Sequence, residues 1–165
     1  ASAVPDAPSA LSPPTAFSQR LRQFLAPEIR EGLVTVLEDA QTTTVRLTNR
    51  NMFASGQAIL GPTYPALLVR IGDAIEPEPG QVTVYGYTDN QPIRTARFPS
   101  NFELSQARAD TVATALRARL KAPARVVAKG KGEADPIAPN ATPDGRQQNR
   151  RTEITLTRPS DKDTP

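Results

Sequence analysis

The chain has 165 residues, enough for one domain with a substantial core. It contains neither cysteine nor histidine, which excludes thiol nucleophiles, Ser-His-Asp catalysis and the usual zinc ligands, so we expect no metal and no cofactor. The net charge of +3 comes from dispersed basic residues without a basic stripe, which argues against nucleic acid as a partner. No apolar run approaches the roughly 18 residues of a membrane-spanning helix. No signal peptide is recognisable either, so we expect any membrane anchor to precede Ala1.

Much of the proline lies toward the two ends of the chain. Residues 1–15 are small, proline-rich and without periodicity, which predicts a disordered linker. Residues 159–165 predict a disordered tail. The folded domain is therefore expected over residues 16–158.

The first half of the domain predicts a helix, a hairpin and a second helix. Apolar residues recur at helical spacing over residues 17–31, until Gly32 breaks the pattern. The alternating segments within residues 33–47 predict a β-hairpin. Pro62 is suited to the first position of a short helix, which ends near the proline and glycine cluster at 77–80.

The second half predicts three more strands and one long helix. In chain order we expect a strand over 81–87, a polar loop, a helix from the capping box Ser100/Glu103 to about Lys121, a core strand over 125–130, a loop over 130–148 and a strand over 151–157. This order predicts one α/β domain, an α+β sandwich in which helices pack on one face of a mixed sheet.

One arginine stands on the apolar face of the helix predicted from residue 101. At about 100° per residue, Arg108 falls within the same arc as Leu104. Burying a guanidinium costs several kcal/mol unless a carboxylate lies beside it. Asp89 follows the strand 81–87 and is the expected partner, because a strand end and the first turns of the next helix often meet at one rim. Two interpretations stay open: a structural ion pair, or a site that offers both charges to an amino-acid head group.

Several separated motifs, in order, resemble the OmpA-like peptidoglycan-binding family. They are Gly86-Tyr87-Thr88-Asp89, Asn101-Phe102-Glu103-Leu104-Ser105-Gln106-Ala107-Arg108-Ala109-Asp110-Thr111-Val112, Gly130-Lys131-Gly132, Pro136 and Asn149-Arg150-Arg151. The resemblance covers roughly residues 45–158 and implies the OmpA-like fold. It also implies binding of the meso-diaminopimelate residue in the peptidoglycan stem peptide. The implied peptidoglycan-binding residues are Thr88, Asp89, Asn101, Leu104, Arg108 and Arg150.

Three of these residues also have structural interpretations. Asn101 suits a helix start, Leu104 suits core packing, and Arg150 suits an ion pair at the end of a strand. One position departs from the family, because Tyr87 stands where the family has histidine. If the tyrosine hydroxyl does not replace a hydrogen bond of that histidine, the loop that carries Asp89 would be misplaced.

The long loop over residues 90–100 resembles those of flagellar stator MotB proteins and type VI secretion TssL proteins. The segments 25–39 and 52–58 resemble TssL. This implies a periplasmic module of an inner-membrane protein in a Gram-negative bacterium, which anchors the type VI secretion complex to the cell wall. Its implied partners are peptidoglycan and other membrane-complex subunits. A MotB-like stator anchor is the alternative, which an upstream membrane helix with a proton-relay aspartate would favour.

Other classes of function are weaker. A carboxylate-based hydrolase needs two carboxylates across the scissile bond, whereas Asp89 is the one carboxylate of the site motif and suits a permanent anion beside an arginine. We therefore expect no enzyme. A protein–protein module that has lost peptidoglycan binding stays open because of Tyr87, and the sequence leaves a homodimer open.

Overall fold

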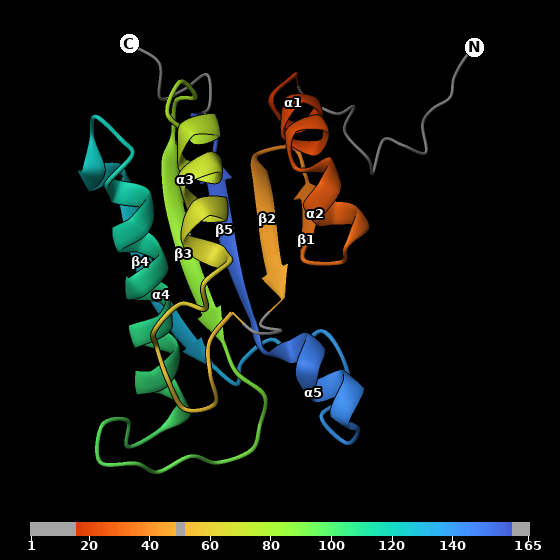
Figure 1. Cartoon of the computed structure of the whole chain (residues 1–165), viewed down its shortest axis with the longest axis vertical. Coiled ribbons are helices and arrows are strands. Elements are labelled where there is room, and N and C mark those ends of the chain that lie inside the picture. Colours follow the sequence, from red (N-terminus) through yellow and green to blue (C-terminus); the bar gives the residue numbers. More distant parts are fainter. Residues whose placement is uncertain (1–15, 49–51, 160–165) are drawn as a thin grey trace.

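The computed structural model describes residues 16–48 and 52–159. The linker predicted over 1–15 lies outside the described residues, as does nearly all of the predicted tail. Figure 1 shows one sheet with α1 to α4 in front of it and α5 beyond one end of it.

The sheet has five strands in the order β1-β2-β5-β3-β4. Their bounds are β1 Val34–Glu38, β2 Thr42–Thr48, β3 Gln81–Tyr87, β4 Val126–Gly132 and β5 Arg151–Thr157. β1, β2, β5 and β3 pair antiparallel, whereas β3 and β4 pair parallel. The predicted mixed sheet is confirmed. The strand predicted at 125–130 was placed wrongly as a core strand, because β4 forms an edge of the sheet.

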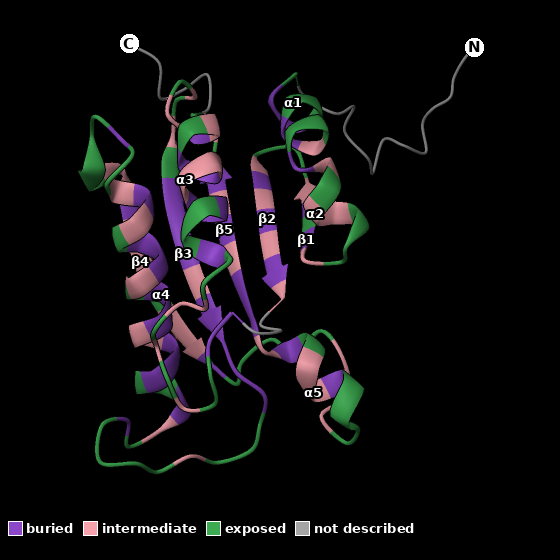
Figure 2. Cartoon of the chain, viewed as in Figure 1, coloured by how far each residue is buried: buried purple, intermediate pink, exposed green. Residues whose placement is uncertain are grey.

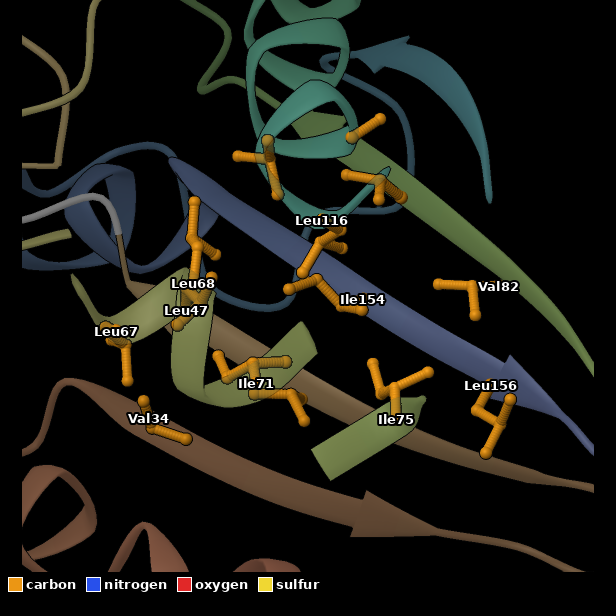
Figure 3. Packing of buried hydrophobic residues seen from close by; sticks show 14 of the residues in the cluster. Val34, Leu47, Leu67, Leu68, Ile71, Ile75, Val82, Leu116, Ile154 and Leu156 are labelled. Atoms are coloured by element: carbon orange, nitrogen blue, oxygen red, sulfur yellow. The ribbon is translucent and has the colours of Figure 1, made fainter. Parts of the chain in front are cut away.

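Helices bury one face of this sheet, and a further short helix, α5, lies at one end of it. Their bounds are α1 Ala16–Phe24, α2 Ala26–Arg30, α3 Tyr64–Ile75, α4 Asn101–Arg117 and α5 Pro143–Asn149, with a short 3-10 turn, η2, at Pro123–Arg125. Along β2 and most of β5, buried positions alternate with partly exposed ones, whereas nearly all of β3 is buried (Figure 2). The buried strand positions and the apolar faces of α1, α3 and α4 form one core. Figure 3 shows Ile71 and Ile75 of α3 and Leu116 of α4 pointing toward Val82 and Ile154 of the sheet.

Two predicted elements differ from the structure. The helix predicted over 17–31 is divided at Leu25, because Pro27 has no N–H to donate and its ring crowds the preceding turn. The loop predicted over 130–148 contains α5, which was missed. Thr142 caps α5 by accepting a hydrogen bond from the Gly145 N–H at 3.0 Å. Threonine followed by proline is a sequence signal for a helix start, so α5 was predictable.

Two glycines set how α4 lies on the sheet. A Cβ built on Gly86 of β3 would lie 2.4 Å from the Ser105 carbonyl oxygen, and one built on Gly130 of β4 would lie 2.5 Å from the Gln106 nitrogen. Helix backbone therefore packs directly against strand backbone at the first turns of α4. This contact brings the beginning of α4 close to the end of β3.

Candidate functional site

A cavity of about 670 Å³ lies where the loops after β2 and β3 meet the beginning of α4 and the end of α5. Figure 1 shows these segments together at one end of the sheet. All six residues predicted to bind peptidoglycan line this cavity: Thr88, Asp89, Asn101, Leu104, Arg108 and Arg150. The structure therefore brings the whole predicted set to one place, although the ligand contacts of these residues remain predictions.

Asp89 is a buried carboxylate with both oxygens engaged. Its Oδ2 accepts a hydrogen bond from Arg150 Nη1 at 2.5 Å, and its Oδ1 accepts one from the Gln91 N–H at 3.0 Å. The Asp89 side chain is 9% exposed, whereas that of Arg150 is 34% exposed. Asp89 is thus a fixed anion that faces the cavity.

Asn101, the first residue of α4, holds the loop that carries Asp89. Its Nδ2 donates to the Gln91 carbonyl at 2.9 Å and approaches the Asp89 carbonyl at 3.5 Å. Thr88 adds a second constraint, because its Oγ1 donates to the Asp89 carbonyl at 2.8 Å and its N–H donates to the Gly132 carbonyl at 2.8 Å. The helix start and β4 together fix where the carboxylate points.

Arg108 is buried, with 5% of its surface exposed. Its Nε donates to the Gln57 carbonyl at 2.7 Å, and its Nη2 donates to the Ala54 carbonyl at 3.1 Å. The guanidinium carbon lies 5.0 Å from the centroid of the Phe53 ring. Carbonyl dipoles and an aromatic face therefore hold this cation, and across residues 16–48 and 52–159 no carboxylate lies within salt-bridge distance of it.

The predicted direct pairing of Asp89 with Arg108 is wrong, because the ion-pair partner of Asp89 is Arg150. The predicted ion pair of Arg150 at the end of a strand is present in the structure, with Asp89 as its partner. Arg150 also lines the cavity. Helical periodicity identified Arg108 as buried. Periodicity could not predict that carbonyls of the loop over residues 52–63 contact Arg108, because that loop has no periodic pattern.

The electrostatics of Arg108 follow from this environment. Burial, followed by the charge on Arg150, lowers the pKa of Arg108 from 12.5 to about 10, and the charge on Asp89 partly opposes this shift. The side chain is still a cation at neutral pH. A buried cation without a carboxylate partner favours an anion that enters from the cavity.

Apolar and amide groups also line the cavity. Leu104 is 4% exposed, which agrees with its core interpretation as well as with its place in the lining. Phe53 and Gln147 were not predicted as site residues. The Gln147 Oε1 accepts from Arg150 Nη2 at 2.8 Å, whereas its Nε2 is buried and has no hydrogen-bond partner among the described residues. Gln147 lies on α5, so missing that helix also hid this residue.

Tyr87 contacts the protein through its ring. The Arg151 guanidinium lies 3.7 Å from the ring centroid. Burial, followed by the charge on Glu153, raises the pKa of Tyr87 to about 12. Arg151 in turn donates to Glu153 at 2.8 Å and to the Asp135 carbonyl at 2.9 Å. Tyr87 therefore joins the end of β3 to β5, and the Asp89 loop is held by Asn101 and Thr88.

Two further features are absent from residues 16–48 and 52–159. That part of the chain has no group of three histidine, cysteine, aspartate or glutamate side chains that could hold a metal ion. Neither does it contain a helix of the length and apolarity that a bilayer requires.

The sequence matches the OmpA family over residues 52–150, which is more than half of the chain. The chain belongs to the OmpA family. The matched stretch contains all six predicted site residues, and the resemblance predicted from the motifs is confirmed. The sequence is also 41% identical over 105 residues to the peptidoglycan-binding protein ArfA of Mycobacterium tuberculosis, which covers 63% of this chain and 31% of ArfA.

Two solved structures are similar over most of the OmpA-family chain. The cell wall anchor of the type VI secretion system from Pseudomonas aeruginosa superposes with a TM-score of 0.79 and 42% identity, covering 84% of this chain and 97% of that one. The periplasmic domain of Helicobacter pylori MotB superposes with a TM-score of 0.70 and 25% identity, covering 77% of this chain and 83% of that one. Against several curated relatives, the chain spans between 31% and 59% of their length.

Proposed function

We propose that this chain is a non-catalytic wall-binding module that holds the amino-acid head group of meso-diaminopimelate in the peptidoglycan stem peptide. The observation that carries the proposal is one cavity with a buried guanidinium, Arg108, and a separate buried carboxylate, Asp89. The head-group carboxylate binds Arg108, which lacks an acidic partner. The head-group ammonium binds Asp89, whose contact with Arg150 leaves it facing the cavity.

The same geometry supports binding without bond cleavage. Asp89 is the one carboxylate in the described lining, and its two oxygens accept hydrogen bonds from Arg150 and from the Gln91 N–H. Glycoside hydrolysis needs a second carboxyl group on the far side of the scissile bond. We expect wild-type protein to release no soluble fragments from peptidoglycan.

A sedimentation assay with purified diaminopimelate-type sacculi tests the proposal. Wild-type protein is expected in the pellet, whereas Asp89→Asn and Arg108→Lys are expected in the supernatant. Asp89→Asn can still accept the Gln91 N–H, and Arg108→Lys keeps the charge but loses the fork that grips a carboxylate. Arg119→Ala is the matched control, because Arg119 lies just beyond α4 and pairs with Asp73 at the surface.

Circular dichroism of each variant separates lost binding from lost structure. Wild-type protein that stays in the supernatant would contradict the proposal and would favour a protein–protein module. Pellet binding by both site variants at the wild-type level would also contradict it. Tyr87 stands at the position of the family histidine, so this assay decides whether the module still binds peptidoglycan or has lost that activity.

At the level of the cell, we propose that the module lies in the periplasm and anchors an inner-membrane complex of a type VI secretion system to the wall. The similarity to the Pseudomonas aeruginosa anchor supports this proposal. The similarity to MotB supports the second candidate, a flagellar stator anchor. Full-length Asp89→Asn protein, expressed in its own host, is expected to impair type VI secretion while swimming stays normal. The opposite result would favour the stator.

A further inference from the structure

The described lining of the cavity has more positive charge than a zwitterionic head group can match. It contains three guanidinium groups, from Arg94, Arg108 and Arg150, and one carboxylate, from Asp89. A zwitterion brings one carboxylate and one ammonium, so its binding leaves the excess of two positive charges unchanged. Arg108 and Arg150 also act on each other, because the charge on Arg150 contributes to the lowered pKa of Arg108. The site is therefore electrostatically incomplete with a head group alone.

Arg94 is the cation that is placed to meet a further anion. It lies on the loop between β3 and α4, lines the cavity and is exposed. Arg150 is engaged with Asp89 and Gln147, and Arg108 binds the head-group carboxylate under the proposed function. Within the part of the chain that the structure describes, Arg94 forms no ion pair. Its guanidinium can grip a carboxylate that remains near the mouth of the cavity.

We propose that Arg94 binds a second carboxylate of the ligand, so that the site selects stem peptides whose residue next to diaminopimelate has a free carboxylate over those in which it is amidated. This inference rests on the proposed function, because it assumes that the head group occupies the inner part of the cavity. Arg108 and Asp89 then bind the head group, which both kinds of stem peptide share. Arg94 distinguishes the peptide with the free carboxylate from the amidated one. Amidation removes one negative charge without changing the shape of the peptide appreciably.

Arg97 provides a matched control on the same loop. It has the same charge and is exposed like Arg94, but it is absent from the described lining. Its guanidinium carbon lies 5.6 Å from the centroid of the Phe98 ring. A general effect of positive charge on this loop would change equally with either arginine, whereas a specific contact would change with Arg94 alone.

The test is a titration of the whole chain, followed by NMR chemical shifts, with three ligands. They are free meso-diaminopimelate and two tripeptides, alanyl-γ-glutamyl-diaminopimelate with the glutamyl α-carboxylate either free or amidated. Wild-type protein is expected to bind the free-carboxylate tripeptide about threefold to tenfold more tightly than the amidated one. This preference should shrink at high ionic strength, because Arg94 is exposed to solvent. Arg94→Gln should lose the preference, and Arg97→Gln should keep it.

Equal affinity of wild-type protein for the two tripeptides would overturn the role of Arg94. A preference that persists in Arg94→Gln, or that disappears equally in Arg97→Gln, would overturn it as well. In each of these cases, binding of meso-diaminopimelate itself would leave the proposed function standing. Failure of all three ligands to bind would instead refute the proposed function and this inference together.

Discussion

One face of the sheet serves two different purposes along its length. Under α3 and the second half of α4, it is filled with aliphatic side chains such as Ile71, Val82 and Ile154 (Figure 3). At the end of β3, the first half of α4 instead presents Arg108 beside a cavity, opposite Asp89. The same helix therefore builds both the core and the site. The aliphatic region stabilises the fold through burial of apolar surface. The charged region contains buried polar groups, which need hydrogen bonds or charged partners to offset the loss of water.

The largest expected effect on stability is in the aliphatic region. Ile71 is fully buried, so Ile71→Ala should lower the free energy of unfolding by about 2–5 kcal/mol through lost burial and a residual cavity. Urea denaturation measures the change. Ile59→Ala is the control, because Ile59 is 66% exposed and its truncation should change stability by less than about 0.5 kcal/mol. Similar effects for both would contradict the assignment of the core.

The next effect tests the contact that joins the two regions. Gly86→Ala would place a methyl group against the Ser105 carbonyl, which belongs to helix backbone and cannot rotate away. We expect a loss of about 1–3 kcal/mol from this overpacking, together with weaker sedimentation with sacculi as α4 shifts. Gly56→Ala is not a neutral control, because Gly56 has a φ of +69°, which strains any residue with a Cβ. An unchanged Gly86→Ala protein would show that α4 tolerates displacement without cost.

A smaller effect concerns the pH dependence of stability at Tyr87. Its pKa is about 12 in the folded protein, above the ordinary 10.0, so the folded state keeps the phenol proton longer than the unfolded state. The resulting contribution is complete below pH 10 and is lost as the pH rises toward 12. Its size is on the order of 1 kcal/mol. Between pH 9 and pH 11, wild-type stability should therefore fall more than that of Tyr87→Phe, and parallel curves would contradict this.

The smallest expected effect on stability belongs to the site itself. Arg108→Met removes a buried cation and replaces it with an apolar side chain of similar length, which should change the free energy of unfolding by less than about 1 kcal/mol. Binding to sacculi should nevertheless be abolished. Urea denaturation and sedimentation on the same sample measure both. A loss of more than about 3 kcal/mol would mean that Arg108 is a structural residue.

The order of the elements could be predicted because each element has a local cause. Alternation marked the strands, and the Ser100/Glu103 pair marked the start of α4, which begins at Asn101. Two local signals were overlooked: Pro27, which divides the first helix, and Thr142 with Pro143, which begins α5. Both lay within the printed sequence. The edge position of β4 had no such local signal, because the order of strands in a sheet depends on how distant segments pair.

The sequence by itself predicted six residues that line the cavity. Periodicity placed Arg108 on a buried face, and the family motifs supplied the rest of the set that lines the cavity. Tertiary structure decided which charges meet. Arg150 reaches Asp89 across 61 positions, and carbonyls 51 and 54 positions away hold Arg108. Periodicity reports which face of an element is buried, whereas these contacts depend on sheet register and on loops that have no period.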